Sequence, residues 1–556
     1  MNYVAENQGS EKALESNFPI LTAEQVLEQE RRRLQERRRQ ARLAAGQPEK
    51  DAVGLTFSGG GIRSATFNLG LLQAMHRYGF LKHVDYLSTV SGGGYIGSSL
   101  TWFMSCLKQD FPFGTSRRDN TETPGAIVSW LRQHASYLTP GEGIDLWALS
   151  AAIIRGTLVN LLVIIPILFV VTVFLVWLPG PVIMAGYPHD GFTALLLVGL
   201  ASLALLGITS IFYALFSSFR RLQRFRLRHR TNFWMGRMLF FGAGFVVLGT
   251  IPFLHGYLDL YFEHLIEEFN TSFSLAGVLS LVAGWIGRDS GKELKGYRKV
   301  LLNVGLALAA YGLLQWMYHG ADAIVNDGDV VRDELLRGGI ILSILIGVLA
   351  NINYVSIHRY YRDRLLEAFM PPVDFTDFSA PNKCLLKDVP QTTAPYQIIN
   401  TMMMTWNSST PKLRIRGGDN FIFTPLFCGA QSTGYAPSTH YLGGTMDLST
   451  AFSISGAAID PNTGVTRSRP LSFMMTLLNL RVGYWARNPK RPARIMKGWS
   501  RPYWLIYSLR EMFGLKMDEN QMHIYLSDGG HFENLGLYEL IRRRCRYIVL
   551  CDAAED

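Results

Sequence analysis

The chain has 556 residues, of which 48% are hydrophobic, and its mean hydropathy of +0.12 is high for a water-soluble protein. This length exceeds one ordinary domain, so two or three domains are expected. The net charge is +10, and the five cysteines are scattered and form no CxxC pair, so neither a zinc site nor a disulfide framework is indicated. No cluster of metal ligands is visible in the sequence, and we expect no metal or cofactor.

The first 50 residues form a charged arm. Residues 1–20 are mostly polar and lack the apolar core of a signal peptide. Residues 24–45 (EQVLEQERRRLQERRRQARLAA) favour a helix, but their apolar positions are too sparse for a buried one. We expect a solvated helix with paired charges. The alternative is a basic helix that lies on anionic lipid through Arg31–Arg33 and Arg37–Arg39.

Next comes a strand, a glycine-rich turn and a helix. Val53–Phe57 is a short apolar run that ends in Ser58 and three glycines. Backbone amides in this turn, near the positive end of the following helix, can hold the oxyanion of an acyl-transfer intermediate. Arg63 is placed to brace the turn or to contact a lipid phosphate. The candidate oxyanion residues are Gly59, Gly60, Gly61 and Arg63.

A second strand leads to a second glycine turn. Val84–Val90 is followed by Ser91 and then by Gly92–Gly94, which is the arrangement of a nucleophile elbow. Each glycine run can also be an ordinary tight turn. A nucleotide-phosphate loop is the weaker alternative, because the spacing matches neither GxGxxG nor GxxxxGK[ST].

The composition changes between residues 151 and 354. Six apolar stretches lie near 157–177, 192–216, 238–258, 271–287, 300–318 and 338–355. A membrane span needs about 20 residues, so all but the marginal fourth are long enough. Basic loops at 219–237, 288–299 and 356–364 alternate with acidic loops at 259–268 and 319–336. By the positive-inside rule, this pattern predicts six spans with both termini in the cytoplasm. The alternative is a set of core helices in a soluble domain.

After the last span, His358–Phe369 has the pattern of an amphipathic helix, which we expect to lie on the membrane. Ser453 and Ser455 lack the setting of an elbow, so we expect them to pack near the site. A further cluster would suit a contact with the membrane interface, or is an ordinary basic surface loop. It consists of Trp485, Arg487, Lys490, Arg491 and Arg494.

A candidate base lies near the end of the chain. His523–Ser527 is a plausible strand, and Asp528 follows at its tip before two glycines. An Asp-Gly-Gly sequence by itself is usually a plain turn. If Asp528 and Ser91 form one site, both ends of the chain must return to the same side of the membrane. The number of spans must then be even.

The GGGIR turn, the Ser91 elbow and the late DGG together resemble the patatin-like phospholipases. The resemblance implies a three-layer α/β catalytic domain with a metal-independent Ser–Asp dyad. In this chain Ser91 would be the nucleophile, Asp528 the base, and Gly59–Gly61 with Arg63 the oxyanion loop. One position departs from the family's GxSxG pattern, because Thr89 stands where the first glycine is usual.

We therefore expect an arm (1–50), a first catalytic segment (51–150), an inserted all-α module of six transmembrane helices (151–356) and a second catalytic segment (357–556). The predicted function is that of a membrane-anchored acyl hydrolase that cleaves fatty-acyl esters of membrane lipids. We expect no nucleic-acid partner. The alternative is a catalytically silent membrane receptor or scaffold. A transporter ranks third, since the spans hold no paired carboxylates.

Overall fold

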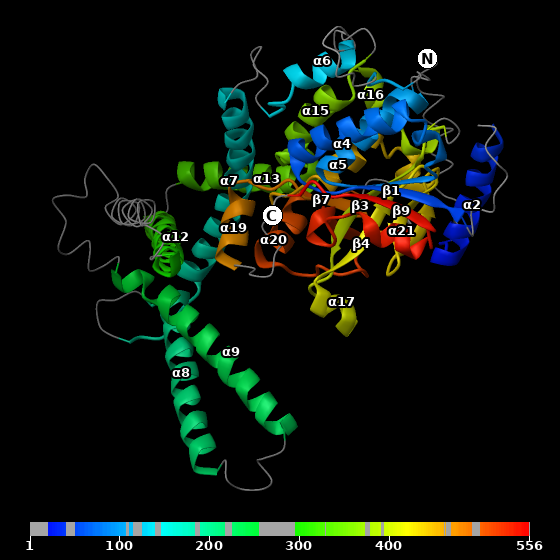
Figure 1. Cartoon of the computed structure of the whole chain (residues 1–556). Coiled ribbons are helices and arrows are strands. Elements are labelled where there is room, and N and C mark those ends of the chain that lie inside the picture. Colours follow the sequence, from blue (N-terminus) through cyan, green and yellow to red (C-terminus); the bar gives the residue numbers. More distant parts are fainter. Residues whose placement is uncertain are drawn as a thin grey trace. The chain divides into compact units, whose positions relative to one another are not determined.

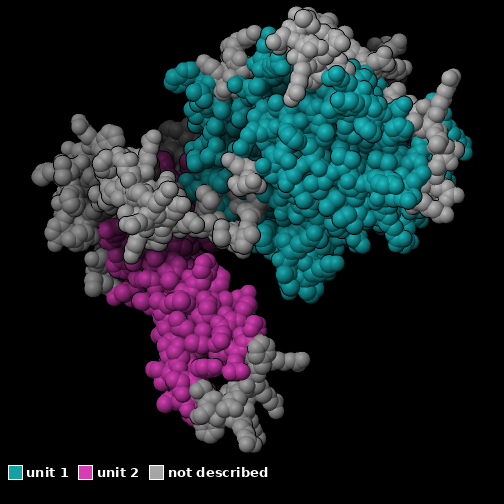
Figure 2. Space-filling view, viewed as in Figure 1, with its two compact units in different colours: residues 1–161, 347–556 teal, residues 162–346 magenta. Residues whose placement is uncertain are grey.

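The computed structural model describes residues 20–40, 51–106, 111–114, 125–138, 146–183, 189–216, 225–254, 295–327, 330–372, 379–390, 394–460, 462, 469–491 and 501–554. The chain forms two compact units (Figure 2). Unit 1 comprises residues 1–161 and 347–556, and unit 2 comprises residues 162–346. Unit 1 is thus made of two segments that unit 2 separates in sequence.

Unit 1 contains a nine-stranded sheet. Its strands are β1 (Val53–Phe57), β2 (Tyr86–Val90), β3 (Tyr396–Met404), β4 (Gly418–Phe423), β5 (Phe427–Ala430), β6 (Gly434–Pro437), β7 (Tyr484–Arg487), β8 (His523–Asp528) and β9 (Tyr547–Cys551). Its helices include α2 (Ala23–Gln40), α4 (Gly61–Arg77), α5 (Gly92–Thr101), α6 (Ala126–Gln133), α14 (Ile352–Val355), α15 (His358–Phe369), α16 (Ser379–Asn382), α17 (Pro411–Arg416), α18 (Leu448–Ser455), α19 (Arg469–Leu477), α20 (Trp504–Phe513) and α21 (Leu537–Arg542).

The sheet joins strands from both segments of unit 1. Its main order is β6-β5-β4-β3-β2-β1-β9, with β8 paired to β3 and β7 paired to β8. Figure 1 labels β1, β3, β4, β7 and β9 of this sheet. The neighbours β9, β1, β2 and β3 run parallel, and the remaining pairs are antiparallel. In the β2–β3 pair Leu87 lies opposite Gln397, so a strand before the insertion hydrogen-bonds to one that follows it.

Helices cover both faces of this sheet. Side chains alternate between the faces along a strand, so Leu87 and Ile399 enter one core while Tyr86 and Ile398 enter the other. The first core is completed by α4, α5 and α15, and the second by α2 and α21. The unit therefore has the three-layer α/β core expected from the sequence.

The N-terminal helix α2 corrects one expectation. One face of it packs against the sheet rather than being solvated or spread on lipid, because Val26 and Leu34 are buried in the second core. Three charged side chains, Glu30, Arg37 and Arg38, are buried as well. Glu30 forms an ion pair with Arg543 (2.8 Å between Oε1 and Nη2), and Arg38 donates to Asp85 (2.8 Å). Paired charges of this kind can be buried because each partner offsets the other's lost hydration.

Two further expectations about membrane contact are wrong. Helix α15 forms where expected, but Tyr361, Leu365 and Phe369 lie in the first core. Trp485 lies in β7 with 1% of its surface exposed, and its indole nitrogen donates to the buried carboxylate of Glu511. The amphipathic pattern of α15 faces protein rather than lipid.

Three helices in the described part of the chain are long and apolar enough to cross a membrane. They are Leu146–Trp177 (α7), Gly191–Phe216 (α8) and Leu227–Leu254, which continues from α9 (Phe225–Gly249). They coincide with the first three expected spans.

The other expected spans have different outcomes. The fourth, at 271–287, lies outside the described residues, as do the loop 259–268 and most of the loop 288–299. The fifth lies within the continuous helix α12 (Lys295–Asp327), but part of its stretch falls outside the residues whose side chains are described, so this span stays a prediction. At the sixth, α13 (Val330–Leu349) carries only a shorter apolar helix, Arg337–Leu349. That helix does not continue to residue 355, because Asn351 pairs with Tyr503 in unit 1.

Candidate active site

Ser91 stands on a strained turn between β2 and α5. Its backbone has φ 48° and ψ −122°, a conformation that residues with a side chain rarely adopt. The glycines after it allow the turn to pack. A Cβ at Gly92 would lie 2.0 Å from the carbonyl oxygen of Gly61, and one at Gly93 would lie 2.5 Å from that of Phe57. The local geometry is that of the expected elbow.

Thr89 fits this turn because a glycine faces it. A Cβ added to Gly97 would lie 2.7 Å from Cγ2 of Thr89, so the absence of a side chain on α5 makes room for the threonine methyl group. The departure from the GxSxG pattern is thus matched by Gly97.

The structure brings Ser91 and Asp528 together, although 437 positions separate them in the chain. The Ser91 hydroxyl donates to Oδ2 of Asp528 at 2.8 Å, and the amide of Gly530 donates to Oδ1 at 2.7 Å. Both side chains are buried. Burial raises the pKa of Asp528 to about 6, although its two hydrogen bonds act in the opposite direction. The carboxylate is therefore more basic than an exposed one but still largely ionised at neutral pH.

A second serine holds the nucleophile's backbone. The amide of Ser91 donates to Oγ of Ser455 at 2.9 Å, and that hydroxyl donates to the carbonyl oxygen of Asn400 at 2.6 Å. Ser455 therefore ties the elbow to α18 and β3, which confirms that it packs near the site. Ser453, by contrast, donates within its own helix to Thr450.

The first glycine turn lies beside Ser91. A Cβ at Gly59 would lie 3.3 Å from that of Ser91, and Gly60 precedes α4 with a φ of 144°. The amide of Gly59 donates to the carbonyl oxygen of Asn534 at 2.9 Å. Gly59 is thus not available as an oxyanion donor in this structure, which corrects its predicted role. Gly60 and Gly61 stay candidates at the positive end of α4. Arg63 follows on the first turn of that helix, with its side chain exposed.

Among the described residues, no group of three or more His, Cys, Asp or Glu side chains is arranged to hold a metal ion.

One family model matches part of the chain. The model of the family described as patatin-like phospholipase matches residues 55–136. This segment of the chain is similar to the patatin-like phospholipases. The matched segment contains the candidate oxyanion turn and the elbow and ends well before Asp528.

One solved structure similar to this patatin-like chain is human GIVD cytosolic phospholipase A2, with 12% sequence identity and a TM-score of 0.32. The alignment covers 95% of this chain and 50% of that one, so the chain spans about half the length of this structure. No curated protein matches the sequence.

Sequence reasoning missed one contact in this patatin-like site. Asn534 receives the Gly59 amide and packs against both turns, because its Oδ1 lies 2.1 Å from a Cβ built on Gly59 and 2.6 Å from one on Gly530. It therefore lies between the oxyanion turn and the turn that carries Asp528. In the sequence, the one feature that could have pointed to Asn534 was its position six residues after Asp528.

Proposed function

We propose that this patatin-like protein is a membrane-anchored serine acyl hydrolase that cleaves fatty-acyl esters of membrane lipids. The observation that carries the proposal is the 2.8 Å hydrogen bond from a hydroxyl on a strained elbow to a buried carboxylate. A hydroxyl nucleophile needs an adjacent base of suitable basicity, and Asp528 supplies one whose pKa burial raises to about 6.

In the proposed reaction, Asp528 accepts the Ser91 proton as Oγ attacks the ester carbonyl carbon. Gly60 and Gly61 would donate their amide hydrogens to the oxyanion that forms. The bond to the leaving alcohol then breaks, and Asp528 returns the proton to that oxygen. Water next attacks the acyl group on Ser91, with Asp528 again accepting the proton. The bond between the acyl carbon and Oγ then breaks, Asp528 returns that proton to Oγ of Ser91, and the fatty acid leaves.

The position of the dyad also bears on the membrane. Unit 2 lies between Ser91 and Asp528 in sequence, and three of its described helices qualify as spans. An odd number of crossings would place the two residues on opposite sides of a bilayer, which is incompatible with their hydrogen bond. We therefore propose at least one further crossing between residues 255 and 349. Six crossings, with both termini in the cytoplasm, agree with the alternation of basic and acidic loops.

Labelling with a fluorophosphonate tests the hydrolase against the silent receptor or scaffold. We expect the wild-type protein to label at Ser91 and to release fatty acid from lipids in mixed micelles. Ser91→Ala should do neither, while expression and membrane insertion are retained. Ser453→Ala, which changes a buried serine outside the dyad, is the matched control. Full activity in Ser91→Ala would rule out the assignment, and an unlabelled wild-type protein without turnover would favour the receptor.

A further inference from the structure

One face of α20 carries large apolar side chains that are partly exposed to solvent. Ile506, Leu509 and Phe513 are 50%, 40% and 49% exposed, and their spacing puts them on one side of the helix. Leu515, just beyond the end of the helix, is 52% exposed. We call these four residues the α20 stripe. Clustered exposed apolar residues of this kind mark an interaction surface.

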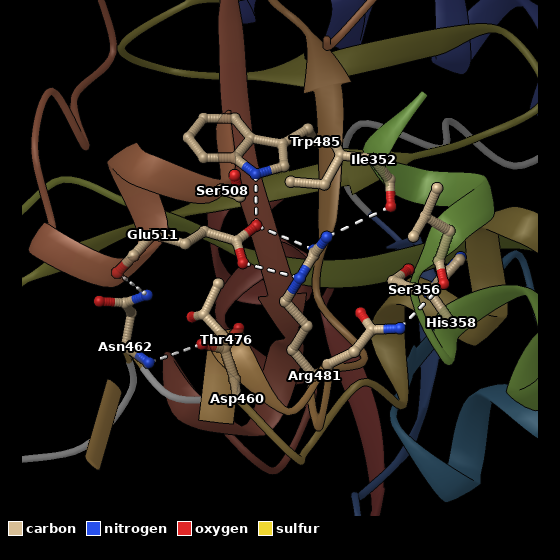
Figure 3. Close-up of polar contacts among 12 residues, drawn as sticks. Ile352, Ser356, His358, Asp460, Asn462, Thr476, Arg481, Trp485, Ser508 and Glu511 are labelled. Carbon is tan, nitrogen blue, oxygen red and sulfur yellow. Dashed lines mark hydrogen bonds and ion pairs between the residues drawn. The ribbon is translucent and has the colours of Figure 1, made fainter. Parts of the chain in front are cut away.

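The opposite side of α20 is fixed by a buried ion pair (Figure 3). Nη1 of Arg481 donates to Oε1 of Glu511 at 2.9 Å, and Nε of Arg481 forms an ion pair with Oε2 at 2.8 Å. Trp485 also donates to this carboxylate. A rotation of α20 that turned Ile506, Leu509 and Phe513 toward the core would separate Glu511 from Arg481. One of the two charges would then stay buried without a partner. The α20 stripe therefore has to face outward.

Both α19 and α20 are attached to the base of α7. The side-chain amide of Asn160 donates to the carbonyl oxygens of Thr476 (2.8 Å) and Leu477 (2.9 Å), which end α19. The indole of Trp504, the first residue of α20, donates to Oδ1 of Asn160 at 2.8 Å. The backbone amide of Trp504 also donates to Ala350, where the chain returns from α13. All these residues belong to unit 1.

Asn160 lies close to where α7 would enter the hydrocarbon region. Arg155 is the last charged residue of α7, and residues 156–177 contain no charge. At 1.5 Å per residue this stretch is about 33 Å long, close to the thickness of the hydrocarbon core of a bilayer. Residues bonded to Asn160 would therefore lie at the level of the bilayer surface.

We propose that the α20 stripe inserts into the interface of an anionic bilayer on the unit 1 side. Arg501 and Lys516 are exposed near its two ends, where they would contact lipid phosphates. Helix α20 begins at Trp504, which is bonded to Asn160 of α7. We therefore favour lipid over a second copy of the chain as the surface that the α20 stripe contacts. The inference rests on the proposed membrane anchoring but not on hydrolysis.

The test uses the full chain in nanodiscs of phosphatidylcholine and phosphatidylglycerol. Phe513→Cys is labelled with the environment-sensitive fluorophore NBD. Ile415→Cys, on α17 and 83% exposed, is the matched control. Wild-type protein treated in the same way gives the background from native cysteines. We expect blue-shifted emission at position 513 and about a twofold loss when the acyl chains are brominated, because interfacial helices bury their apolar face about 5–10 Å deep. The control should show neither change.

Emission at position 513 that matches the control would overturn the proposal. Blue-shifted emission that brominated lipid does not quench and that persists in detergent would assign the α20 stripe to a second copy, which also overturns it.

A functional measurement separates this proposal from the proposed hydrolase. Leu509→Glu combined with Phe513→Glu should lower the hydrolysis of a bilayer ester about tenfold, because the α20 stripe would no longer insert into the bilayer interface. Turnover of a soluble short-chain ester should be unchanged, and Ile415→Glu should affect neither. If the wild-type protein cleaves neither ester, the hydrolase proposal fails, whereas the fluorescence still decides where the α20 stripe lies.

Discussion

Replacing Asp528 with asparagine tests both the chemistry and the electrostatics of the dyad. The amide keeps the size of the carboxyl group and an oxygen that can accept from the Gly530 amide, but it cannot take the serine proton. We expect ester turnover to be lost. We also expect the variant to be more stable than the wild-type protein at neutral pH, which is unusual for a change at a buried polar position.

The magnitude follows from the pKa of the Asp528 carboxyl, which burial raises from 3.8 to about 6. Each pKa unit corresponds to about 1.36 kcal/mol, so the ionised group lowers the free energy of unfolding by about 3 kcal/mol. Below pH 3.8 the group is protonated in both the folded and the unfolded state, and this cost is absent. This destabilisation grows as the pH rises from 3.8 and reaches its full size above about pH 6. The stability difference between the variant and the wild-type protein should follow the same course.

Thermal unfolding in detergent, monitored by tryptophan fluorescence between pH 4 and pH 8, measures this difference. The midpoint of Asp528→Asn should exceed that of the wild-type protein by several degrees at pH 7.5, and the two should converge near pH 4. Asp388→Asn, which changes an exposed carboxylate, is the control and should show little effect of pH. A difference that stays constant with pH, or that widens on acidification, would refute the reasoning.

Three other predictions concern the same unit. For the wild-type protein, kcat/KM should fall by half near pH 6 as the pH is lowered, because the reaction needs ionised Asp528; a constant rate down to pH 4.5 would contradict this role. Ser455→Ala should lower kcat about tenfold by leaving the buried Ser91 amide without its acceptor, whereas Ser453→Ala should change kcat little. Glu30→Gln should destabilise the protein by about 3–5 kcal/mol, because it leaves the Arg543 charge buried. Glu36→Gln, on the exposed side of the same helix, should cost less than about 1 kcal/mol in unfolding measurements.

The sequence predicted the parts of the fold whose signals are local. The strand, glycine turn and helix around Gly59–Gly61, and the elbow at Ser91, each depend on residues within a few positions. Asp528 could be found as well, because a short strand and two glycines surround it. Its nearness to Ser91 was expected through the family resemblance, and the structure shows the contact directly.

Features that depend on distant partners could not be predicted in this way. Helix α2 seemed too polar to be buried, because the partner of Glu30 is Arg543, 513 positions away. The same reason explains Trp485, whose basic neighbours suggested a surface but whose indole bonds to Glu511. The loss of the Gly59 amide to Asn534 is a backbone contact, and such contacts leave almost no trace in residue type.

The separation of Ser91 from Asp528 has a consequence for how the protein is made. Translation proceeds from the N-terminus, so the elbow leaves the ribosome hundreds of residues before the carboxylate that activates it. The apolar helices of unit 2 emerge in between, and under the proposed membrane anchoring they would engage the insertion machinery first. A nascent or truncated chain would therefore carry the proposed nucleophile without its proposed base, and the proposed hydrolysis could begin only after synthesis has reached Asp528.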